Sequence, residues 1–458
     1  MPTLPAERLN DLVAAKRLDS DLPAVAAGIV AGGSLAWFAG QGWSDLDRGT
    51  RPTDRSLSRV ASVTKTFTAT AILQMRDRGL LSLDDPLERH LPEFAAARET
   101  GGRRADVTIR RLLTHRSGLV TESPPTQWDG PDGPVFPSPD QVFAALPQTA
   151  VAIPADSAFK YSNLAFALLG EVVARLAGMP YVEHVRTAIF EPLGMMDSTY
   201  APGDRHRGLL MTGYSPGIHS DRPVPAPTAS LHGLTAAGQL YTNVRDLSEW
   251  VVFQLRGDGL ARDGRRILGE ESWAQSIRPL YAEPDLSAAQ CLAWRMTRIG
   301  EHVFHNHGGS VHGFNTSVGF HRPSGVGVVV LTNLWPTTAA SELAFELLDT
   351  AIGGPAARTW PRPAAAPPPP VPAALAPFLG RFGAEPGITM DVEWRDGAMR
   401  FASPPRQSPL HTPAMLEPVA GREGAFRVLT GRAAGEEIAF DAGAESFGLG
   451  GFLYRRAR

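Results

Sequence analysis

Cysteine and lysine are both scarce in this chain of 458 residues. A single cysteine, Cys291, excludes an internal disulfide bond and any metal site built from several cysteines. Only three lysines occur, against 41 arginines: Lys16, Lys65 and Lys160. Arginine stays charged in proteins, whereas a lysine in a desolvated pocket can lose its proton and act as a base. We therefore expect lysine to remain mainly where arginine cannot replace it.

An excess of charge of either sign is also missing. The net charge is −3, with 20% charged and 43% hydrophobic residues, which is typical of a soluble globular enzyme. This balance predicts no binding surface for nucleic acid or for an anionic membrane. The uncharged stretch Leu22–Gly40 is interrupted by Pro23, Gly28 and Gly32-Gly33, which favours a β-hairpin over a membrane span. Residues 1–21 predict an amphipathic helix rather than a signal peptide, so the expected compartment is the cytoplasm.

The apolar periodicity predicts strands at both ends of the first 352 residues and helices between them. The predicted strands are a hairpin over 22–48 and three antiparallel strands over 302–307, 314–321 and 326–332. The predicted helices cover residues 62–79, 163–176 and 339–352, and residues 107–119 are predicted to form a short helix followed by a turn at Ser117-Gly118. We expect a sheet built from the two chain ends with a helical region alongside. Residues 121–140 hold six prolines and two glycines and are predicted to form a surface loop, a candidate lid.

The composition changes after residue 354. Nine prolines lie between Pro355 and Pro377, which predicts a semi-rigid linker. Residues 375–458 contain no good helix, and a hairpin is predicted around Asp396-Gly397, with Val392 and Trp394 pairing with Met399 and Phe401. We therefore predict three parts: a first domain over 1–354, a linker over 355–374 and a small β-barrel or sandwich over 375–458.

Ser62-Val63-Thr64-Lys65 is the most informative motif. On a helix, residues three apart lie on one face, about 5–6 Å apart at Cβ. Ser62 and Lys65 are thus predicted to share a proton, which is how an activated serine nucleophile works. An S-x-x-K in a chain of this length also arises by chance, so the motif needs support from elsewhere.

Two further motifs give that support. Tyr161-Ser162-Asn163 directly precedes a predicted helix, and His307-Gly308-Gly309, followed by Ser310, lies at the end of a predicted strand. Each has a simpler explanation, because Ser and Asn favour helix caps and a strand histidine is common. All three motifs in this order form a joint pattern that chance seldom produces.

Further segments accompany these motifs: Arg59-Val60-Ala61, Leu112-Leu113-Thr114-His115-Arg116-Ser117-Gly118-Leu119, Pro192-Leu193-Gly194-Met195-Met196 and Gly238-Gln239-Leu240-Tyr241-Thr242. With them the chain resembles the serine β-lactamase and penicillin-binding-protein superfamily, in the branch of class C β-lactamases, D-amino-acid peptidases and β-lactamase-fold esterases. The resemblance runs from about residue 20 to 352. It implies an α/β (α+β) fold with an antiparallel sheet flanked by helices and an all-helical region. The proline-rich linker and β-rich tail look like the lipocalin-like β-barrel appended to some members.

The resemblance implies a catalytic role for each of several residues in these motifs. Ser62 would be the nucleophile that forms an acyl-enzyme, and Lys65 and Tyr161 would share its proton. Asn163 would orient Lys65 and the substrate amide. The backbone N–H groups of Ser62 and Ser310 would form the oxyanion hole, where one donor is typically worth about 10²–10³ in rate.

The third motif departs from many relatives. His307 stands where they carry lysine, and Gly308, which precedes Gly309, stands where they carry threonine. The resemblance implies that His307 polarises the tyrosine hydrogen-bond network or binds a substrate carboxylate. Without the fixed cation and the hydroxyl, we do not expect efficient β-lactam hydrolysis.

The leading hypothesis is an S-x-x-K serine hydrolase or acyltransferase that hydrolyses small ester, amide or peptide substrates as an esterase or D-peptidase does, without cofactor or metal. One alternative is a penicillin-binding-protein-type thioesterase that cyclises peptides by macrolactamisation, or a transacylase in secondary metabolism. An alternative of another class is a non-catalytic ligand-binding or sensor module. The sequence leaves the oligomeric state open.

Two rival enzyme classes find less support. An α/β-hydrolase needs a G-x-S-x-G elbow, which is missing from the sequence. A metal hydrolase is suggested by four histidines, but no acidic partner has ligand spacing and no H-E-x-x-H occurs: His302, His305, His307 and His312. In the C-terminal part, one hypothesis is that the tail around Tyr454-Arg455-Arg456 reaches the active-site mouth and holds a substrate carboxylate.

Overall fold

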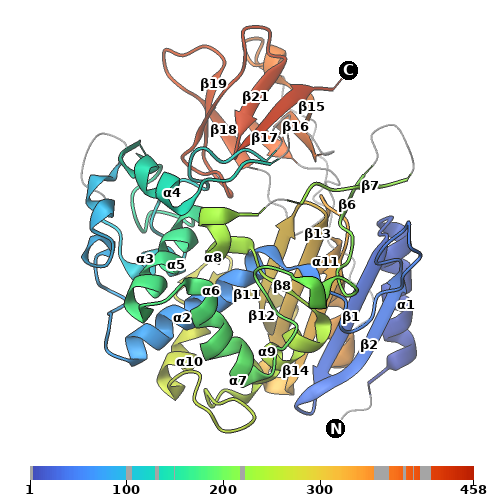
Figure 1. The fold of residues 1–458 in the computed structure, drawn as a ribbon. Helices are drawn as coiled ribbons and strands as arrows, with labels where there is room; N and C mark the ends of the chain where they lie inside the picture. Colours follow the sequence, from blue (N-terminus) through green and yellow to red (C-terminus); the bar gives the residue numbers. More distant parts are fainter. Residues whose placement is uncertain are drawn as a thin grey trace. The chain divides into compact units, whose positions relative to one another are not determined.

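The computed structural model folds into two compact units, each assembled from two separate stretches of chain (Figure 1). The first unit combines Met1–Asp85 with Phe166–Ala357, and the second combines Pro86–Ala165 with Arg358–Arg458. Each unit is described by itself. The structure describes residues 4–99, 106–128, 134–148, 150–216, 222–228, 230–354, 371–384, 388–395, 397–402 and 414–457.

An antiparallel sheet forms the centre of the first unit, in the order β2-β1-β14-β13-β12-β11-β10-β9. The strands are β1 (Ala24–Ala31), β2 (Ser34–Gly42), β9 (Tyr281–Ala282), β10 (Ala288–Gln290), β11 (Arg295–Ile299), β12 (His302–Val311), β13 (Phe314–His321) and β14 (Val326–Thr332). The N-terminal hairpin pairs with the last strand, with Val25 opposite Thr332. The prediction that the two chain ends build one sheet is therefore confirmed.

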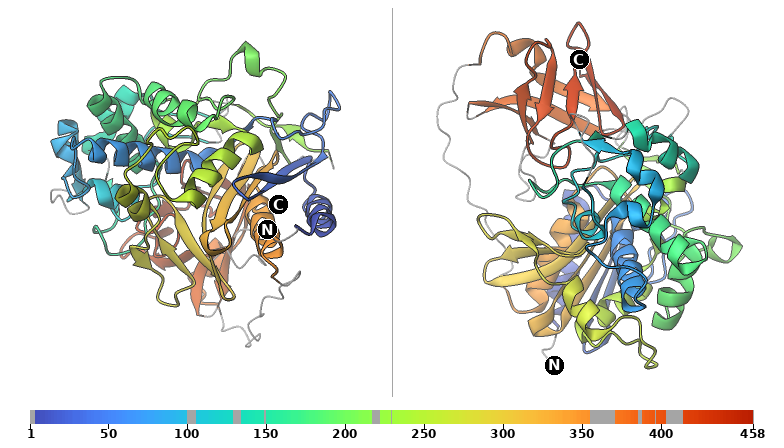
Figure 2. Two further views of the ribbon diagram at one scale, coloured as in Figure 1. Left: turned by 90° about the horizontal axis from the view of Figure 1, so that it is seen from below. Right: turned by 90° about the vertical axis from the view of Figure 1, so that its left-hand side faces the viewer.

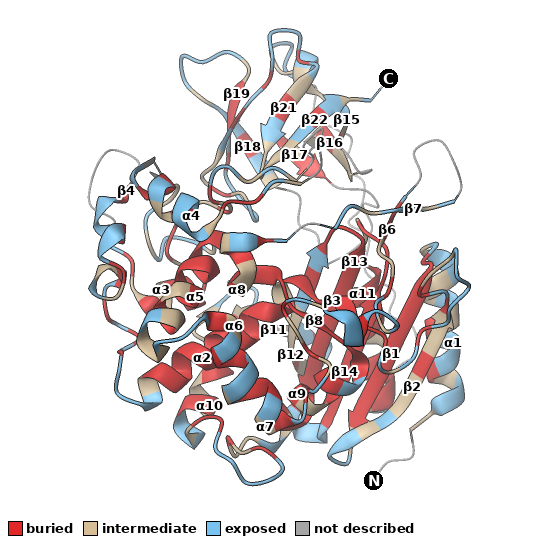
Figure 3. Ribbon diagram, viewed as in Figure 1, coloured by how far each residue is buried: buried red, intermediate tan, exposed pale blue. Residues whose placement is uncertain are grey.

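Helices cover both faces of this sheet, so every residue of the central strands β13 and β14 is buried, including the polar residues of β13 (Figures 2 and 3). One face carries α1 (Ala6–Asp19) and α11 (Ala339–Ala351), whose side chains share a core with alternate residues of β1 and β14: Val25, Ala27, Ile29, Val326, Val328 and Val330.

The opposite face of the sheet carries α9 (Val244–Arg256), and two glycines let it approach closely. A Cβ built on Gly28 would lie 2.6 Å from Val244 Cγ1, and one on Gly327 would lie 2.2 Å from Val251 Cγ1. Asn243 caps this helix by accepting the Asp246 N–H at 2.8 Å, and Gly257 ends it in a left-handed conformation.

The interior of the first unit holds α2 (Thr64–Asp77), which is buried from Thr64 to Met75 and is preceded by the 3₁₀ turn Ala61–Val63. The helix predicted over 62–79 is confirmed, and Gly79 follows it at φ 72°. The remaining helices and strands of this unit are α5 (Asn163–Ala177, in this unit from Phe166 onward), α6 (Tyr181–Val185), α7 (Glu191–Leu193), α8 (Thr235–Gly238), α10 (Glu270–Ser276), β3 (Ser58–Arg59), β6 (Tyr214–Ser215), β7 (Val224–Pro225) and β8 (Tyr241–Thr242).

The stretch Pro86–Ala165 supplies short helical segments to the second unit: α3 (Ile109–Leu113), α4 (Pro139–Ala145), the 3₁₀ turns Leu87–Arg89, Pro92–Ala96 and Leu146–Gln148, and the strand pair β4 (Arg98–Glu99) and β5 (Ala150–Val151). The short helix predicted within 107–119 is observed as α3, ahead of the predicted turn at Ser117-Gly118. It ends because His115 turns to φ 55° and the Arg116 N–H returns to the Arg111 carbonyl at 2.8 Å, a Schellman-type stop.

The C-terminal part of the second unit is an antiparallel, nearly closed eight-stranded barrel in the order β20-β19-β18-β17-β16-β15-β22-β21. Its strands are β15 (Gly380–Ala384), β16 (Ile388–Arg395), β17 (Ala398–Ala402), β18 (Ala414–Pro418), β19 (Ala425–Val428), β20 (Glu437–Ala439), β21 (Ser446–Leu449) and β22 (Phe452–Arg456). A bridge between Phe440 and Phe447 joins the two edges. The barrel prediction is confirmed, and the predicted hairpin has Val392 opposite Phe401 and Trp394 opposite Met399.

Some boundaries differ from the sequence expectation or stay open. The strand predicted over 302–307 continues to Val311, and the edge strands β9 to β11 and helices α9 and α10 were not expected. Residues 355–370 of the predicted linker lie outside the described residues, so the three-part division of the chain stays a prediction.

No single helix among the described residues is both long and apolar enough to cross a membrane. The helix α5 reaches that length and composition only together with Tyr181–Leu193, from which it is bent by 76°.

Candidate active site

Ser62 and Lys65 lie at the start of α2, where the S-x-x-K spacing brings their side chains together. Lys65 Nζ lies 3.1 Å from Ser62 Oγ and donates a hydrogen bond to the Ala237 carbonyl at 2.7 Å. The lysine side chain is fully buried, whereas Ser62 is half-buried. A proton can pass directly between the two groups at this distance, while Ser62 stays open to a substrate.

The backbone in front of Ser62 is strained. Ala61 is buried and has φ 45°, a left-handed conformation that costs a residue with a side chain about 1–3 kcal/mol. Neighbouring hydrogen bonds hold this turn. Thr64 Oγ1 donates to the Ala61 carbonyl at 2.6 Å and accepts the Leu240 N–H at 3.2 Å, and the Val60 N–H binds the Leu240 carbonyl at 2.9 Å. The surrounding fold therefore fixes where Ser62 points.

Gly309 brings strand β12 directly against this turn. A Cβ built on Gly309 would lie 2.1 Å from the Val60 carbonyl oxygen, so no residue with a side chain fits there without moving the turn. Thr316 Oγ1 donates to the same Val60 carbonyl at 3.2 Å. The close approach joins the two segments that carry the N–H groups of Ser62 and Ser310, the predicted oxyanion donors.

His307 lies half-buried on β12 and donates from Nδ1 to the Gly308 carbonyl at 2.7 Å. Burial, followed by the nearby positive charge of Lys65, lowers the pKa of His307 to about 4. The ring is therefore neutral near pH 7 and offers Nε2 as a hydrogen-bond acceptor. Two roles are predicted for His307. A neutral ring can take part in the tyrosine hydrogen-bond network, but it cannot form an ion pair with a substrate carboxylate.

Tyr161 and Asn163 belong to the second unit, and Ser162 between them caps α5. Ser162 Oγ accepts the Ala165 N–H at 3.0 Å, so the capping role considered for this motif is real but falls to the middle residue. The Tyr161 ring stacks on His115, with centroids 4.4 Å apart and planes 28° apart. His115 Nδ1 also accepts the Ser162 N–H at 3.1 Å. The His115 ring therefore holds both Tyr161 and the backbone of Ser162 in place.

Two charged residues that the sequence did not single out complete the surroundings of this motif. Glu122 Oε1 accepts from Asn163 Nδ2 at 2.7 Å and from Arg432 Nη2 at 3.0 Å. The Arg432 guanidinium carbon lies 4.9 Å from the centroid of the Tyr161 ring. No sequence signal marks Arg432, which is one of many arginines and 310 positions from Glu122.

The predicted site residues thus fall into two groups. Ser62, Lys65 and the strand segment His307–Ser310 lie together in the first unit, and Tyr161 and Asn163 lie together in the second. The meeting of the tyrosine with the serine and the lysine stays a prediction.

The candidate lid is tied to the barrel within the second unit. The Trp128 N–H donates to the Gly451 carbonyl at 2.9 Å, and the indole stacks on Phe452 with planes 12° apart. Residues 129–133 of the predicted loop lie outside the described residues. The C-terminal tail is likewise held inside the barrel, because Tyr454 is part of its core and Arg456 binds barrel carbonyls. That the tail reaches a substrate stays a prediction.

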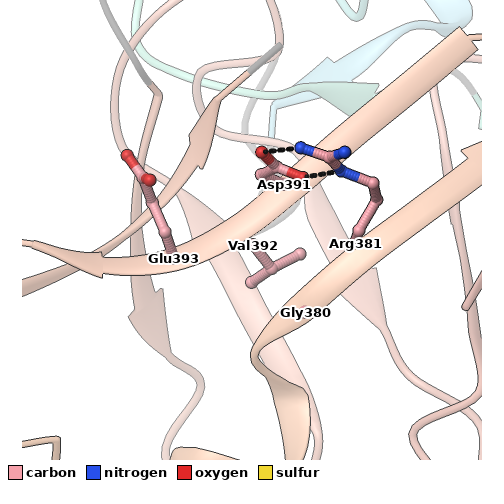
Figure 4. Close-up of a pocket in the computed structure, with 5 residues that line it drawn as sticks. All are labelled: Gly380, Arg381, Asp391, Val392 and Glu393. Atoms are coloured by element: carbon pink, nitrogen blue, oxygen red, sulfur yellow. Dashed lines mark hydrogen bonds and ion pairs between the residues drawn. The ribbon is translucent and has the colours of Figure 1, made fainter. Parts of the chain in front are cut away.

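A metal-binding cluster or a surface depression is another possible kind of site in the described part of the chain. Among the residues described, no three His, Cys, Asp or Glu side chains are arranged to hold a metal ion. His305 instead donates to the Ile277 carbonyl at 3.0 Å and stacks on Phe320. A shallow depression on the barrel is lined by Gly380, Arg381, Asp391, Val392 and Glu393 (Figure 4). A bidentate ion pair joins Arg381 and Asp391, with N–O distances of 2.8 and 3.1 Å.

The turn that begins the buried S-x-x-K helix meets strand β12 of the antiparallel sheet at Gly309, as expected for a serine hydrolase class that transfers acyl groups. The chain matches the family described as Beta-lactamase over residues 9–352 and belongs to that family. The family and superfamily expected from the motifs are thereby confirmed.

The chain is also similar to curated proteins of the same kind. Beta-lactamase-like protein 2 of Dictyostelium discoideum is 26% identical over 332 residues, which are 70% of this chain and 58% of that protein. The D-alanyl-D-alanine-carboxypeptidase/endopeptidase AmpH of Escherichia coli (strain K12) is 29% identical over 240 residues, or 52% of this chain and 59% of that protein. The chain therefore spans less than two thirds of the length of these curated relatives.

Two solved structures share the fold. The octameric penicillin-binding protein homologue from Pyrococcus abyssi has a TM-score of 0.67 at 21% identity, and the match covers 98% of this chain and 100% of that chain. The class C beta lactamase from Rhodobacter sphaeroides has a TM-score of 0.62 at 22% identity, covering 75% of this chain and 99% of that chain. At these identities the likeness shows the fold alone.

Proposed function

We propose that the protein is a serine hydrolase that forms an acyl-enzyme on Ser62 and acts on small ester, amide or peptide substrates. The observation that carries this proposal is the 3.1 Å contact between Ser62 Oγ and the fully buried amine of Lys65. A merely structural lysine has no need of a half-exposed serine as its partner, because a buried carbonyl or carboxylate would satisfy it as well.

The proposed reaction uses these groups in sequence. Ser62 Oγ attacks the substrate carbonyl while its proton passes to Lys65, with Tyr161 proposed as the second member of the proton relay. The carbonyl oxygen becomes an oxyanion that the N–H groups of Ser62 and Ser310 stabilise. Return of the proton to the leaving alcohol or amine breaks the scissile bond and leaves the acyl-serine. Water, activated by the same base, then releases the acid and regenerates Ser62.

Esterase or D-peptidase-like hydrolysis is the proposed activity. The neutral His307 supplies no fixed positive charge for the carboxylate of a β-lactam, which disfavours efficient β-lactam hydrolysis. A carboxypeptidase among the relatives supports a D-alanyl peptide as one substrate to test. Peptide cyclisation is the second candidate, because an amine could attack the same acyl-serine in place of water.

The proposal is tested by covalent labelling followed by a substrate panel. A fluorophosphonate or a fluorescent penicillin should add one label to the intact protein, as read by mass spectrometry. The S62A variant should take up no label, whereas S34A, which removes an exposed serine from the start of β2, should label as the wild type does.

The panel contains p-nitrophenyl esters, a D-alanyl peptide and a peptidyl thioester. Free acid as the main product supports hydrolysis, and a cyclic peptide with negligible free acid supports the cyclase. A wild-type protein that never forms an S62A-sensitive adduct would show that the site is not catalytic and would favour a ligand-binding or sensor module.

A further inference from the structure

The loop between β19 and β20, residues 429–436, packs against the Tyr161 segment. Lys160, the residue before Tyr161, donates from its buried Nζ to Glu436 Oε1 at 2.6 Å and to the Arg432 carbonyl at 3.1 Å. Thr121 Oγ1 donates to the same glutamate oxygen at 2.6 Å. These contacts attach the loop to the residue before the tyrosine and to Thr121, which accepts from Lys160 Nζ at 2.7 Å.

The loop is also shaped for close packing. Gly435 has φ 81°, and a Cβ there would lie 2.4 Å from Ile153 Cγ2 and 2.7 Å from the Ala152 carbonyl. A residue with a side chain fits neither the backbone conformation nor the space. The 429–436 loop therefore docks by its backbone and by Glu436, independently of the Arg432 side chain.

The Arg432 side chain contacts two other residues of the Tyr161 surroundings. Its guanidinium stacks over the Tyr161 ring at 4.9 Å and donates to Glu122, which in turn accepts from Asn163. The Glu122 side chain is 7% exposed and the Arg432 side chain 58% exposed, so this ionic hydrogen bond is shielded from water on the glutamate side only. One side chain from the barrel thus touches the tyrosine directly and the asparagine through one carboxylate.

We propose that Arg432 is a positioning residue for the acyl-transfer reaction. It fixes the plane of the Tyr161 ring through the cation–π contact, and it holds Glu122 in the orientation that orders the Asn163 amide. The C-terminal barrel thereby contributes to catalysis through a residue that does not touch the reacting atoms. This inference rests on the proposed function, because it assigns Arg432 to the same site.

The test separates positioning from folding. R432A should label with fluorophosphonate and turn over a p-nitrophenyl ester about 10²-fold more slowly, since a misplacement of about 1 Å costs that much. KM and the melting temperature should stay near the wild-type values, because Lys160, Thr121 and Gly435 still dock the loop. R432K should give an intermediate rate, and millimolar guanidinium chloride should restore part of the R432A rate.

The matched control is R427A. Arg427 lies on β19 of the same barrel and donates to Glu437 at 2.8 Å, away from the tyrosine segment, so its loss should leave labelling and turnover unchanged. R432Q is the second variant, in case R432A folds poorly. It keeps a planar hydrogen-bonding group without the charge.

The outcomes distinguish the two proposals. If R432A and R432Q label at the wild-type rate, the positioning role is overturned and the serine-hydrolase proposal stands. If their rates fall only in step with their melting temperatures and guanidinium restores nothing, Arg432 is structural and the inference is again overturned. If the wild type itself forms no Ser62 adduct, both proposals fail together.

Discussion

At the scale of single residues, all three lysines have specific partners. Lys16 pairs with Glu342 and Glu346 at 3.3 and 3.1 Å, Lys65 contacts Ser62, and Lys160 is buried against the barrel. Only the second of these tasks needs an amine that can give up its proton. Arginine can form the ion pairs of the other two but cannot serve as a base near neutral pH.

Lys65→Arg should therefore abolish most activity although it conserves charge. We expect the rate of Ser62 labelling to fall about 10²–10⁴-fold, the usual contribution of a general base, because a guanidinium cannot accept the serine proton. Lys16→Arg is the matched control, and its labelling rate should equal that of the wild type. Stopped-flow or gel-based labelling kinetics measure both, and equal rates for the two variants would remove Lys65 from the mechanism.

At the scale of elements, the turn Ala61–Val63, which carries Ser62, depends on a contact between strand β12 and the residues that precede helix α2. The strand β12 runs through His307-Gly308-Gly309 without a break, and Gly309 meets the Val60 carbonyl. The left-handed Ala61 then presents Ser62. The glycine is needed for space rather than for an unusual φ, which explains why the turn and the strand can lie so close together.

Gly309→Ala should displace this turn. The added methyl would lie 2.1 Å from the Val60 oxygen, and overpacking of this kind typically costs about 1–3 kcal/mol of stability. We also expect Ser62 labelling to slow about 10²-fold, because the nucleophile moves away from its partners.

Gly308→Ala is the comparison for stability, since its Cβ would meet Ser341 Oγ at 3.2 Å, a much milder contact. Calorimetry should show the lower melting temperature for Gly309→Ala. Equal melting temperatures would mean that the turn has room to relax.

At the scale of the whole molecule, the barrel is part of the second unit together with Pro86–Ala165. Lys160 and Glu436 form an ion pair in which the lysine side chain is 0% exposed and the glutamate 18% exposed. Desolvation lowers the pKa of the Lys160 amine, while the charge of Glu436 opposes that change. This ion pair joins the barrel to the tyrosine segment. Removing only one of its two charges is costly, because the other charge then stays without a partner.

Lys160→Met should cost about 3–5 kcal/mol of unfolding free energy, because it leaves the Glu436 carboxylate without its cation. The double variant Lys160→Met/Glu436→Leu should lose less, since neither charge remains. Urea unfolding measures both.

The control is Arg207→Met, which breaks the exposed pair with Asp204 and should cost less than about 1 kcal/mol. A double variant that is less stable than Lys160→Met would contradict the argument.

Much of this architecture could be predicted from local patterns. Periodicities of two or 3.6 residues and glycine turns predict the hairpin at 22–48 and the S-x-x-K helix. The same patterns predict strands β12, β13 and β14 and the pairing of Val392 with Phe401. The edge strands β9 to β11 were missed because they are short and partly exposed, so their pattern is weak.

The sequence by itself determined the family, the fold class and the pairing of Ser62 with Lys65, because each depends on residues near one another in the chain or on a motif with fixed spacing. Only the tertiary structure decided that Ala61 is left-handed, that His307 is neutral and that Arg432 lies over Tyr161. These features arise from burial and from contacts between segments hundreds of residues apart, and no local pattern encodes such contacts.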